Sequence, residues 1–175
     1  MKKLLAIFCV LAVFASTAVA APKKSKVKGS KIGVSMPTKD LQRWNQDGAN
    51  MKAQLEAAGY KVDLQYAAND IPTQVSQIEN MVTGKCKVLV IAAIDGSALK
   101  NPLDQAKKKG IKVIAYDRLI MNTDAVSYYA TFDNYKVGTI QGEYLVDKLG
   151  LKDRTKKNPV YMELFTGDPG DNNIN

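Results

Sequence analysis

Short apolar runs alternate along most of this chain with longer segments in which apolar residues recur at helical spacing. The continuous run Val88-Leu89-Val90-Ile91 is typical of a strand buried on both faces of a sheet. By contrast, Val75, Ile78 and Val82 are spaced to fall on one face of a helix. The pattern predicts strands over residues 32–36, 61–66, 87–92, 111–116, 126–132 and 160–165. It predicts helices over about residues 43–58, from Asp70 onward, over 101–109 and over 134–149.

End signals support these helices. Gly59 and Gly110 stand where a helix C-terminus requires a left-handed residue. Asp70 can cap a helix that carries Pro72 in its first turn. Strand-helix alternation of this length favours right-handed crossovers, so the predicted fold is one α/β domain. It is of doubly wound type, a mostly parallel sheet with helices on both faces. The last helix is expected to pack its apolar residues inward, namely Val137, Ile140, Tyr144 and Leu145.

The first twenty residues have the features of a secretory signal peptide. Lys2 and Lys3 precede an apolar stretch from Leu4 to Val13, and Ala18-Val19-Ala20 is an A-x-A cleavage signal. The apolar stretch is shorter than the about 20 residues that span a bilayer. The sequence therefore predicts cleavage near Ala20 and an exported, soluble product.

The net charge of +8 is concentrated near the start of the chain. Seven of the 25 basic residues precede residue 32 and no acidic residue does, which leaves 18 basic against 17 acidic residues in the remainder. Residues 21–30 form a basic arm, interpreted as a flexible, solvated linker. Because a nucleic-acid binder carries a basic stripe on its folded domain, no nucleic-acid partner is predicted.

Several classes of chemistry lack their usual residues. The chain has no His, which argues against Ser-His or Cys-His catalysis and against most zinc sites. Without an imidazole base, Cys86 is interpreted as a small buried residue. Neither the dinucleotide fingerprint nor the P-loop pattern occurs, so no cofactor and no metal are predicted.

Asp117 and Arg118 follow directly on the predicted strand 111–116. In open α/β sheets, ligands bind just beyond the carboxyl ends of the strands, so this pair marks a candidate site. The alternative is an ordinary loop ion pair, which is common and energetically weak.

Several motifs in order resemble bacterial periplasmic sugar-binding proteins, especially the xylose-binding proteins and multiple-sugar receptors of ABC transporters. The stretches that carry the resemblance are residues 32–38 with Arg43-Trp44, then 76–81, 112–118, 129–134 and 171–173. The resemblance implies two α/β lobes joined by three crossover strands, with a sugar in the cleft between them. This chain would supply the N-terminal lobe over residues 31–165. Residues 166–175, which are polar and rich in turn formers, would begin the first crossover, and the second lobe is missing.

The resemblance also implies a set of sugar contacts. Asp117 and Arg118 would bind hydroxyls, Asp133 would accept and Arg43 would donate. Trp44 would stack on the ring, and Asn172 would contact the sugar from the hinge side. Some of these have plainer alternatives, since Trp44 could be core packing, Asp133 a helix cap and Asn172 part of a turn.

The implied function is capture of a monosaccharide in the periplasm, without catalysis. The sugar would be of the xylose, glucose, galactose or arabinose class, and the partners an ABC permease and possibly a chemoreceptor or sensor kinase. Other interpretations are a sugar-sensing regulator of lac repressor type, a receptor for a furanose, and a secreted carbohydrate-active enzyme. The enzyme would use Asp117 and Asp133 as acid and base.

Overall fold

Five parallel strands form the centre of the molecule. The computed structural model describes residues 29–167 and residue 173. The strands are β1 (Lys31–Met36), β2 (Lys61–Tyr66), β3 (Val88–Ile91), β4 (Lys112–Tyr116) and β5 (Val126–Ala130). Their spatial order is β2-β1-β3-β4-β5, so the chain winds outward in both directions from the middle of the sheet. Neighbouring strands are parallel throughout, as the sequence predicts.

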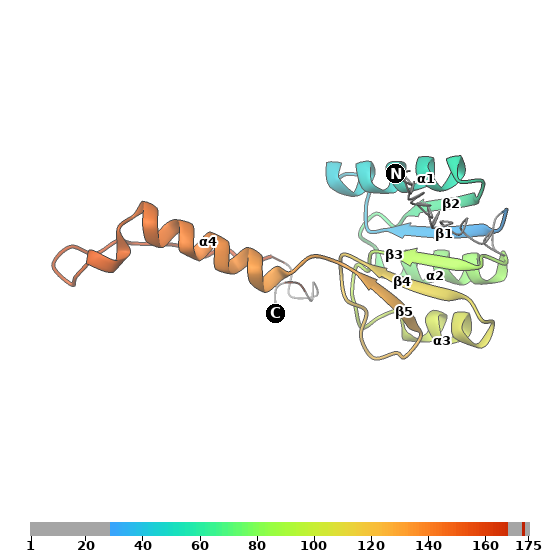
Figure 1. Cartoon of the computed structure of the whole chain (residues 1–175). Helices are drawn as coiled ribbons and strands as arrows, with labels where there is room; N and C mark the ends of the chain where they lie inside the picture. The colour runs from blue at the N-terminus through green and yellow to red at the C-terminus, as the bar shows by residue number, and fades with distance from the viewer. Residues whose placement is uncertain (1–28, 168–172, 174–175) are drawn as a thin grey trace, which may run out of the picture.

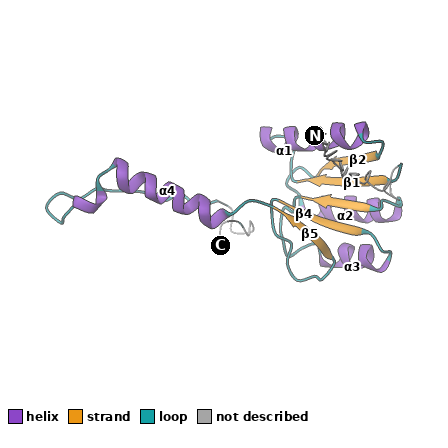
Figure 2. Cartoon of the chain, in the orientation of Figure 1, coloured by secondary structure: helices purple, strands orange, loops and turns teal. Residues whose placement is uncertain are grey.

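Helices cover both faces of this sheet (Figure 2). The covering helices are α1 (Gln42–Ala57), α2 (Ile71–Thr83) and α3 (Lys100–Lys108). The chain continues after β5 with α4 (Asn134–Lys148) and the 3₁₀ turn η1 (Leu151–Asp153). Trp44, Met51 and Leu55 of α1 pack with one face of β1. Ile78 of α2 and Leu103 of α3 belong to a second apolar cluster, on the other face. The doubly wound α/β prediction is confirmed.

Local end signals act as expected. The Asp70 carboxylate accepts the backbone N–H of Thr73 at 2.8 Å and caps α2. Gly59 and Gly110 adopt φ values of +89° and +70° just after α1 and α3, a conformation that costs glycine little. These two glycines turn the chain from the ends of the helices toward the starts of β2 and β4.

Two predictions about the C-terminal part are wrong. Helix α4 does form, but it runs away from the sheet (Figure 1), and the residues expected to face inward are 40–60% exposed. Residues 160–165 form no strand, and Leu164 and Phe165 are 95% and 91% exposed. After β5 the chain leaves the sheet at residues 131–133, so neither a strand neighbour nor an apolar face is within reach. Apolar spacing shows which face of a helix or strand could be buried, but it does not show whether another element packs against that face.

The predicted signal peptide over residues 1–20 and most of the arm over residues 21–30 lie outside the described residues. Among the residues that the structure does describe, no helix combines the length and apolarity required to cross a membrane.

Candidate functional site at the carboxyl ends of the strands

Asp117 lies at the centre of a cluster of polar side chains. It follows β4 directly, has a left-handed φ of +61°, and its side chain is only 4% exposed. Aspartate tolerates this backbone region better than most residues. Its backbone carbonyl accepts the hydroxyls of Tyr129 and Thr131, each at 3.1 Å, and its N–H donates to Ala130. Residues at the end of β5 therefore fix the position of Asp117.

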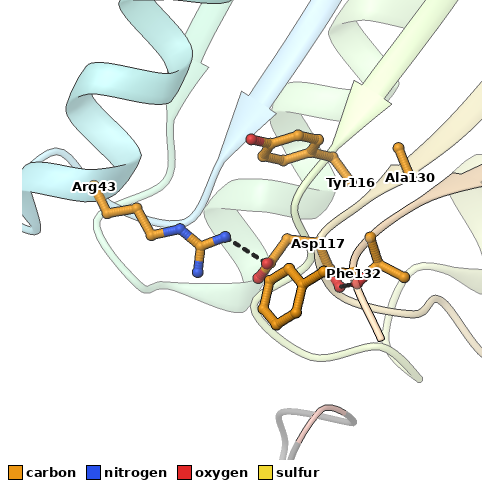
Figure 3. A pocket seen from close by; sticks show the side chains of 6 residues that line it. Arg43, Tyr116, Asp117, Ala130 and Phe132 are labelled. Carbon is orange, nitrogen blue, oxygen red and sulfur yellow. Dashed lines mark hydrogen bonds and ion pairs between the residues drawn. The ribbon is translucent and has the colours of Figure 1, made fainter. Parts of the chain in front are cut away.

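The buried carboxylate of Asp117 is paired with Arg43 from the first turn of α1 (Figure 3). The Arg43 Nη2 to Asp117 Oδ1 distance is 2.5 Å, and Arg43 Nε also lies 3.6 Å from the Asp47 carboxylate. Partial burial works to lower the pKa of Arg43, but the hydrogen bond and charge of Asp117 outweigh it and the pKa is raised. A buried carboxylate needs such a partner, because an unpaired buried charge is costly.

Among the described residues, the guanidinium of Arg118 forms no ion pair with the carboxylate of its neighbour Asp117. Its Nη1 donates to the carbonyls of Ala93 and Ile94, at 3.1 Å and 3.4 Å, in the loop after β3. Asp117 and Arg118 therefore do not form a simple loop ion pair with each other. The two side chains diverge and connect β4 to α1 and to the β3 loop.

Trp44 is buried, and both guanidinium groups lie close to its ring. Its side chain belongs to the core cluster and is 3% exposed. The Arg43 and Arg118 guanidinium carbons lie 4.7 Å and 5.4 Å from the ring centroid, within the range of cation-π attraction. This burial matches the core-packing alternative for Trp44, and the indole packs against the two arginines.

Two adjoining cavities open beside the Asp117 carboxylate. The first is about 310 Å³ and is lined by Arg43, Tyr116, Asp117, Ala130, Thr131 and Phe132. The second, about 370 Å³, shares three of these residues and adds Leu41, Trp44, Arg118, Asn134 and Asn173. Figure 3 shows the Phe132 ring beside the Asp117 carboxylate, and this residue is 50% exposed. Charged hydrogen-bonding groups next to an open aromatic ring suit a ligand with many hydroxyls and apolar C–H faces.

Asp133 and Asn172 are the other two residues that the sequence predicts as sugar contacts. Asp133 caps α4 by accepting the backbone N–H of Lys136 at 2.9 Å. Asn172 lies outside the described residues. Its neighbour Asn173 lies at the site, where the amide donates to the Asp117 carbonyl at 3.2 Å and accepts from Asn134 at 3.1 Å.

Sequence reasoning missed several residues that line this site or bind the backbone of Asp117. Phe132, Tyr129 and Thr131 stand on or just after β5, the sheet neighbour of β4. The available signal was the predicted strand that ends in Tyr129-Ala130-Thr131-Phe132, because neighbouring parallel strands end on the same side of a sheet. Asn173 could not be found by adjacency, since it is 56 residues from its partner Asp117.

The geometry favours binding over proton transfer. The Asp117 carboxylate is held by an arginine, and the Asp133 carboxylate is used by a helix N-terminus. Burial, followed by the hydrogen bond to Asp47, raises the pKa of the nearby Tyr116 hydroxyl, which moves this group further from acting as a base. An acid-base pair of Asp117 and Asp133 receives no support from these contacts.

Comparison with known proteins gives a consistent result. The family model for the periplasmic binding protein domain matches residues 32–175. The chain is 60% identical over 142 residues to the multiple sugar-binding periplasmic protein SbpA of Azospirillum brasilense, covering 81% of this chain and 39% of the relative. It is 41% identical over 170 residues to the D-xylose-binding periplasmic protein of Haemophilus influenzae, covering 97% of this chain and 46% of the relative.

A solved structure agrees with these relatives. The ABC transporter solute-binding protein of Clostridium phytofermentans with bound β-D-glucose is 70% identical, with a TM-score of 0.79, over 83% of this chain and 44% of that one. The chain thus spans less than half the length of each of these three proteins. With this fold, these charged groups at the carboxyl ends of its strands and these relatives, the chain belongs to the periplasmic binding protein domain family.

Proposed function

We propose that this chain is part of the sugar-capturing receptor of an ABC importer, and that it contributes one wall of a pyranose site. The observation that carries the proposal is the buried Asp117 carboxylate, paired with Arg43 and open to a cavity beside Phe132. Relatives named as multiple-sugar and xylose receptors, and one solved with glucose, support the ligand class.

The chemistry of a pyranose fits these groups. Hydrogen bonds to ionised groups are roughly twice as strong as neutral ones, and a guanidinium fork can serve two adjacent oxygens. Asp117 would accept from sugar hydroxyls while Arg43 and Arg118 donate to them. The exposed ring of Phe132 would cover a C–H face. Trp44, Asp133 and Asn172 stay predicted contacts, and for Trp44 a role behind the arginines agrees better with its burial.

The lobe organisation is proposed in a revised form. The packed unit covers residues 31–130, and α4 begins beyond it. The connection at residues 131–133 would be the first crossover, instead of residues 166–175 as the sequence suggested. The contact between Asn173 and Asp117 supports a second crossover, where the chain returns to the site. Helix α4 and residues 160–165 would then belong to the second lobe, whose remainder this chain does not contain.

In the complete receptor, sugar would favour closure of two lobes, and the permease would recognise the closed form in the periplasm. A ligand shifts such an equilibrium only by its differential affinity for the two states, so contacts from both lobes are needed. A chemoreceptor or sensor kinase could recognise the same closed form. No reaction is catalysed in this scheme, and no hydrolysis of a chromogenic glycoside is expected.

The sole tryptophan provides the test. Because Trp44 lies against Arg43 and Arg118, a sugar that engages these arginines should change its fluorescence. We expect titration with glucose, xylose, galactose or arabinose to give a saturable change, weak in this chain and at least about tenfold tighter in a chain extended through the second lobe. Arg154→Ala, which alters an arginine remote from the site, is the control.

The response should disappear in Arg118→Ala and persist in Arg154→Ala. No saturable signal with any of the four sugars, confirmed by calorimetry on the extended chain, would refute the proposal.

A further inference from the structure

Lysines crowd the end of the sheet opposite the candidate site. β1 and β2 begin with Lys31 and Lys61, Lys87 immediately precedes β3, and Lys112 begins β4. Two more lysines occupy the turns that follow α2 and α3 at this end. Together these six residues form the lysine rim: Lys31, Lys61, Lys85, Lys87, Lys109 and Lys112.

Three of these lysines lie in register along one face of the sheet, and Lys112 lies on the other face. Lys31 is in register with Lys61, the N–H of Lys87 donates to the Lys31 carbonyl at 2.8 Å, and the N–H of Lys112 donates to the Lys87 carbonyl at 3.2 Å. Adjacent strands lie about 4.8 Å apart, so Lys61, Lys31 and Lys87 follow one another at about that interval on one face. Lys112 is in register with Val88, so its side chain lies on the opposite face at the same end of the sheet. The carboxyl ends of all five strands, and with them the candidate site, lie at the opposite end of the sheet.

Three of the acidic residues near this end are paired, whereas Glu79 of α2 is exposed and forms no ion pair with another described residue. Asp63 pairs with Lys31 at 2.7 Å, Asp124 with Lys107 at 2.5 Å, and Glu56 with Lys52 at 3.7 Å. Among residues 29–167 and 173, the other five members of the lysine rim are exposed and form no ion pair. Since the chain from residue 32 onward is almost neutral, its charge is strongly segregated rather than merely high.

Helix dipoles explain only part of this charge. α1, α2 and α3 end on this side, and each helix C-terminus carries about half a negative charge. Three such ends offset roughly 1.5 charges, whereas five unpaired lysines supply more than three times that amount. The surplus is available to an external partner.

The composition of the rim indicates what kind of partner it fits. The three arginines of the sequence are elsewhere: two are at the site and Arg154 follows η1. Arginine suits bidentate recognition of one specific group, whereas lysine is a hydrated point charge on a flexible stem. A rim made of lysines alone therefore matches a broad, diffuse negative surface. For a chain with a predicted export signal, the matching surface is an anionic phospholipid bilayer.

We propose that the lysine rim docks this protein electrostatically on an anionic phospholipid surface, with the candidate site turned toward solvent. Each lysine near an anionic bilayer contributes about 1 kcal/mol, so the rim suffices for reversible association.

Sedimentation with vesicles tests the proposal. The intact chain should bind phosphatidylcholine vesicles containing about one third phosphatidylglycerol at low salt, and release as the salt rises through about 0.15 M. Pure phosphatidylcholine vesicles should not retain it. The triple variant Lys61→Glu, Lys87→Glu, Lys112→Glu should bind about a hundredfold more weakly.

The matched control reverses three exposed lysines elsewhere, Lys136→Glu, Lys156→Glu and Lys157→Glu, with the same change in net charge. The proposal requires this control to bind at least about tenfold better than the rim variant. Lys→Arg at the three rim positions should retain binding, and Lys→Gln should lose most of it. These milder variants decide the matter if the Glu variant does not fold.

If the two triple Lys→Glu variants lost vesicle binding equally, the effect would come from net charge alone, and the proposal would be overturned. So would salt-independent binding, which would indicate apolar contact, or absence of binding to the anionic vesicles. Asp117→Asn should leave vesicle binding unchanged, so this outcome is independent of the proposed sugar site.

Discussion

At the residue scale, the candidate site depends on one buried carboxylate and the two guanidinium groups around it. Asp117 joins the end of β4 to α1 through Arg43, to the end of β5 through its carbonyl, and to Asn173. Its left-handed backbone turns the side chain into the site where a regular strand would have continued. Its backbone conformation and its side-chain charge can therefore be tested separately.

Asp117→Asn should retain the backbone, because asparagine tolerates positive φ as aspartate does. It should lose a charged acceptor worth about 1.5–3 kcal/mol, so sugar affinity in the extended chain should fall by about 10- to 100-fold. Asp117→Ala should lose the same affinity and also destabilise the fold by about 1 kcal/mol more, because alanine is strained at this φ. Calorimetric titration and urea unfolding measure the two effects. Unchanged affinity in Asp117→Asn would remove this carboxylate from the site.

Gln74 of α2 is a second residue whose side chain holds part of the site in position. Its Nε2 donates to Ser35 Oγ at 3.1 Å and to the Ala92 carbonyl at 2.9 Å, and its Oε1 accepts the Ile94 N–H at 2.9 Å. It thereby fixes the loop whose carbonyls receive Arg118. Gln74 is fully buried, so these groups have no water to replace it.

Gln74→Met should lower the free energy of unfolding by about 2–3 kcal/mol, because it leaves buried polar groups unsatisfied while keeping similar volume. Gln77→Met is the control, since Gln77 on the same helix makes a single hydrogen bond, to the Tyr66 carbonyl, and should cost about 1 kcal/mol. Urea denaturation gives both values. Equal costs for the two variants would contradict the special role of Gln74.

At the element scale, each helix needs a terminal signal and a partner surface, and the chain shows both cases. α2 has its cap at Asp70 and its buried face against the sheet. α4 has an equally good cap at Asp133, yet no residue of α4 is buried. Capping decides where a helix begins, whereas burial of its apolar face decides whether it packs.

The Asp70 cap should be pH-dependent. Hydrogen bonds from Thr73 lower the pKa of the Asp70 carboxyl below its unfolded value of about 3.9. Its contribution is therefore complete above that value and is lost as the pH falls through the lower native pKa. Asp70→Ala should lower the Tm at pH 7 by about 4 °C, and the difference from the wild type should shrink in acid. Asp70→Asn keeps a capping oxygen and should stay near the wild type at pH 7 in thermal melts. A difference for Asp70→Ala that stays constant down to about pH 2.5 would exclude the titration.

At the scale of the whole molecule, the packed unit ends near Ala130, and α4 stands apart from it. Tyr144 and Leu145 are 60% and 41% exposed, and with Ile140 and Gln141 they line an open apolar groove of about 420 Å³. Apolar side chains in such a position contribute nothing to the stability of the sheet unit. They require a second surface.

Tyr144→Glu with Leu145→Glu should therefore change the free energy of unfolding by less than about 0.5 kcal/mol. Because an exposed apolar groove favours association between copies, the same variant should scatter no more light than the wild type. Leu103→Ala in the core of the sheet unit is the matched contrast and should cost about 2–5 kcal/mol. Denaturation and light scattering test both statements. In the extended chain, the α4 variant should become destabilising, because the added lobe would bury this face.

The sequence by itself determined the alternation of strands and helices, the parallel doubly wound sheet, the Asp70 cap and the place of Asp117 just beyond a strand. These follow from local backbone preference and from apolar spacing, which operate over a few residues. Only the tertiary structure decided that Asp117 pairs with Arg43 rather than Arg118, that Trp44 is buried, and that Asn173 reaches the site. It also decided that α4 and residues 160–165 leave the sheet. Partners distant in sequence are selected by the path of the chain in space, and spacing along the chain carries no record of that path.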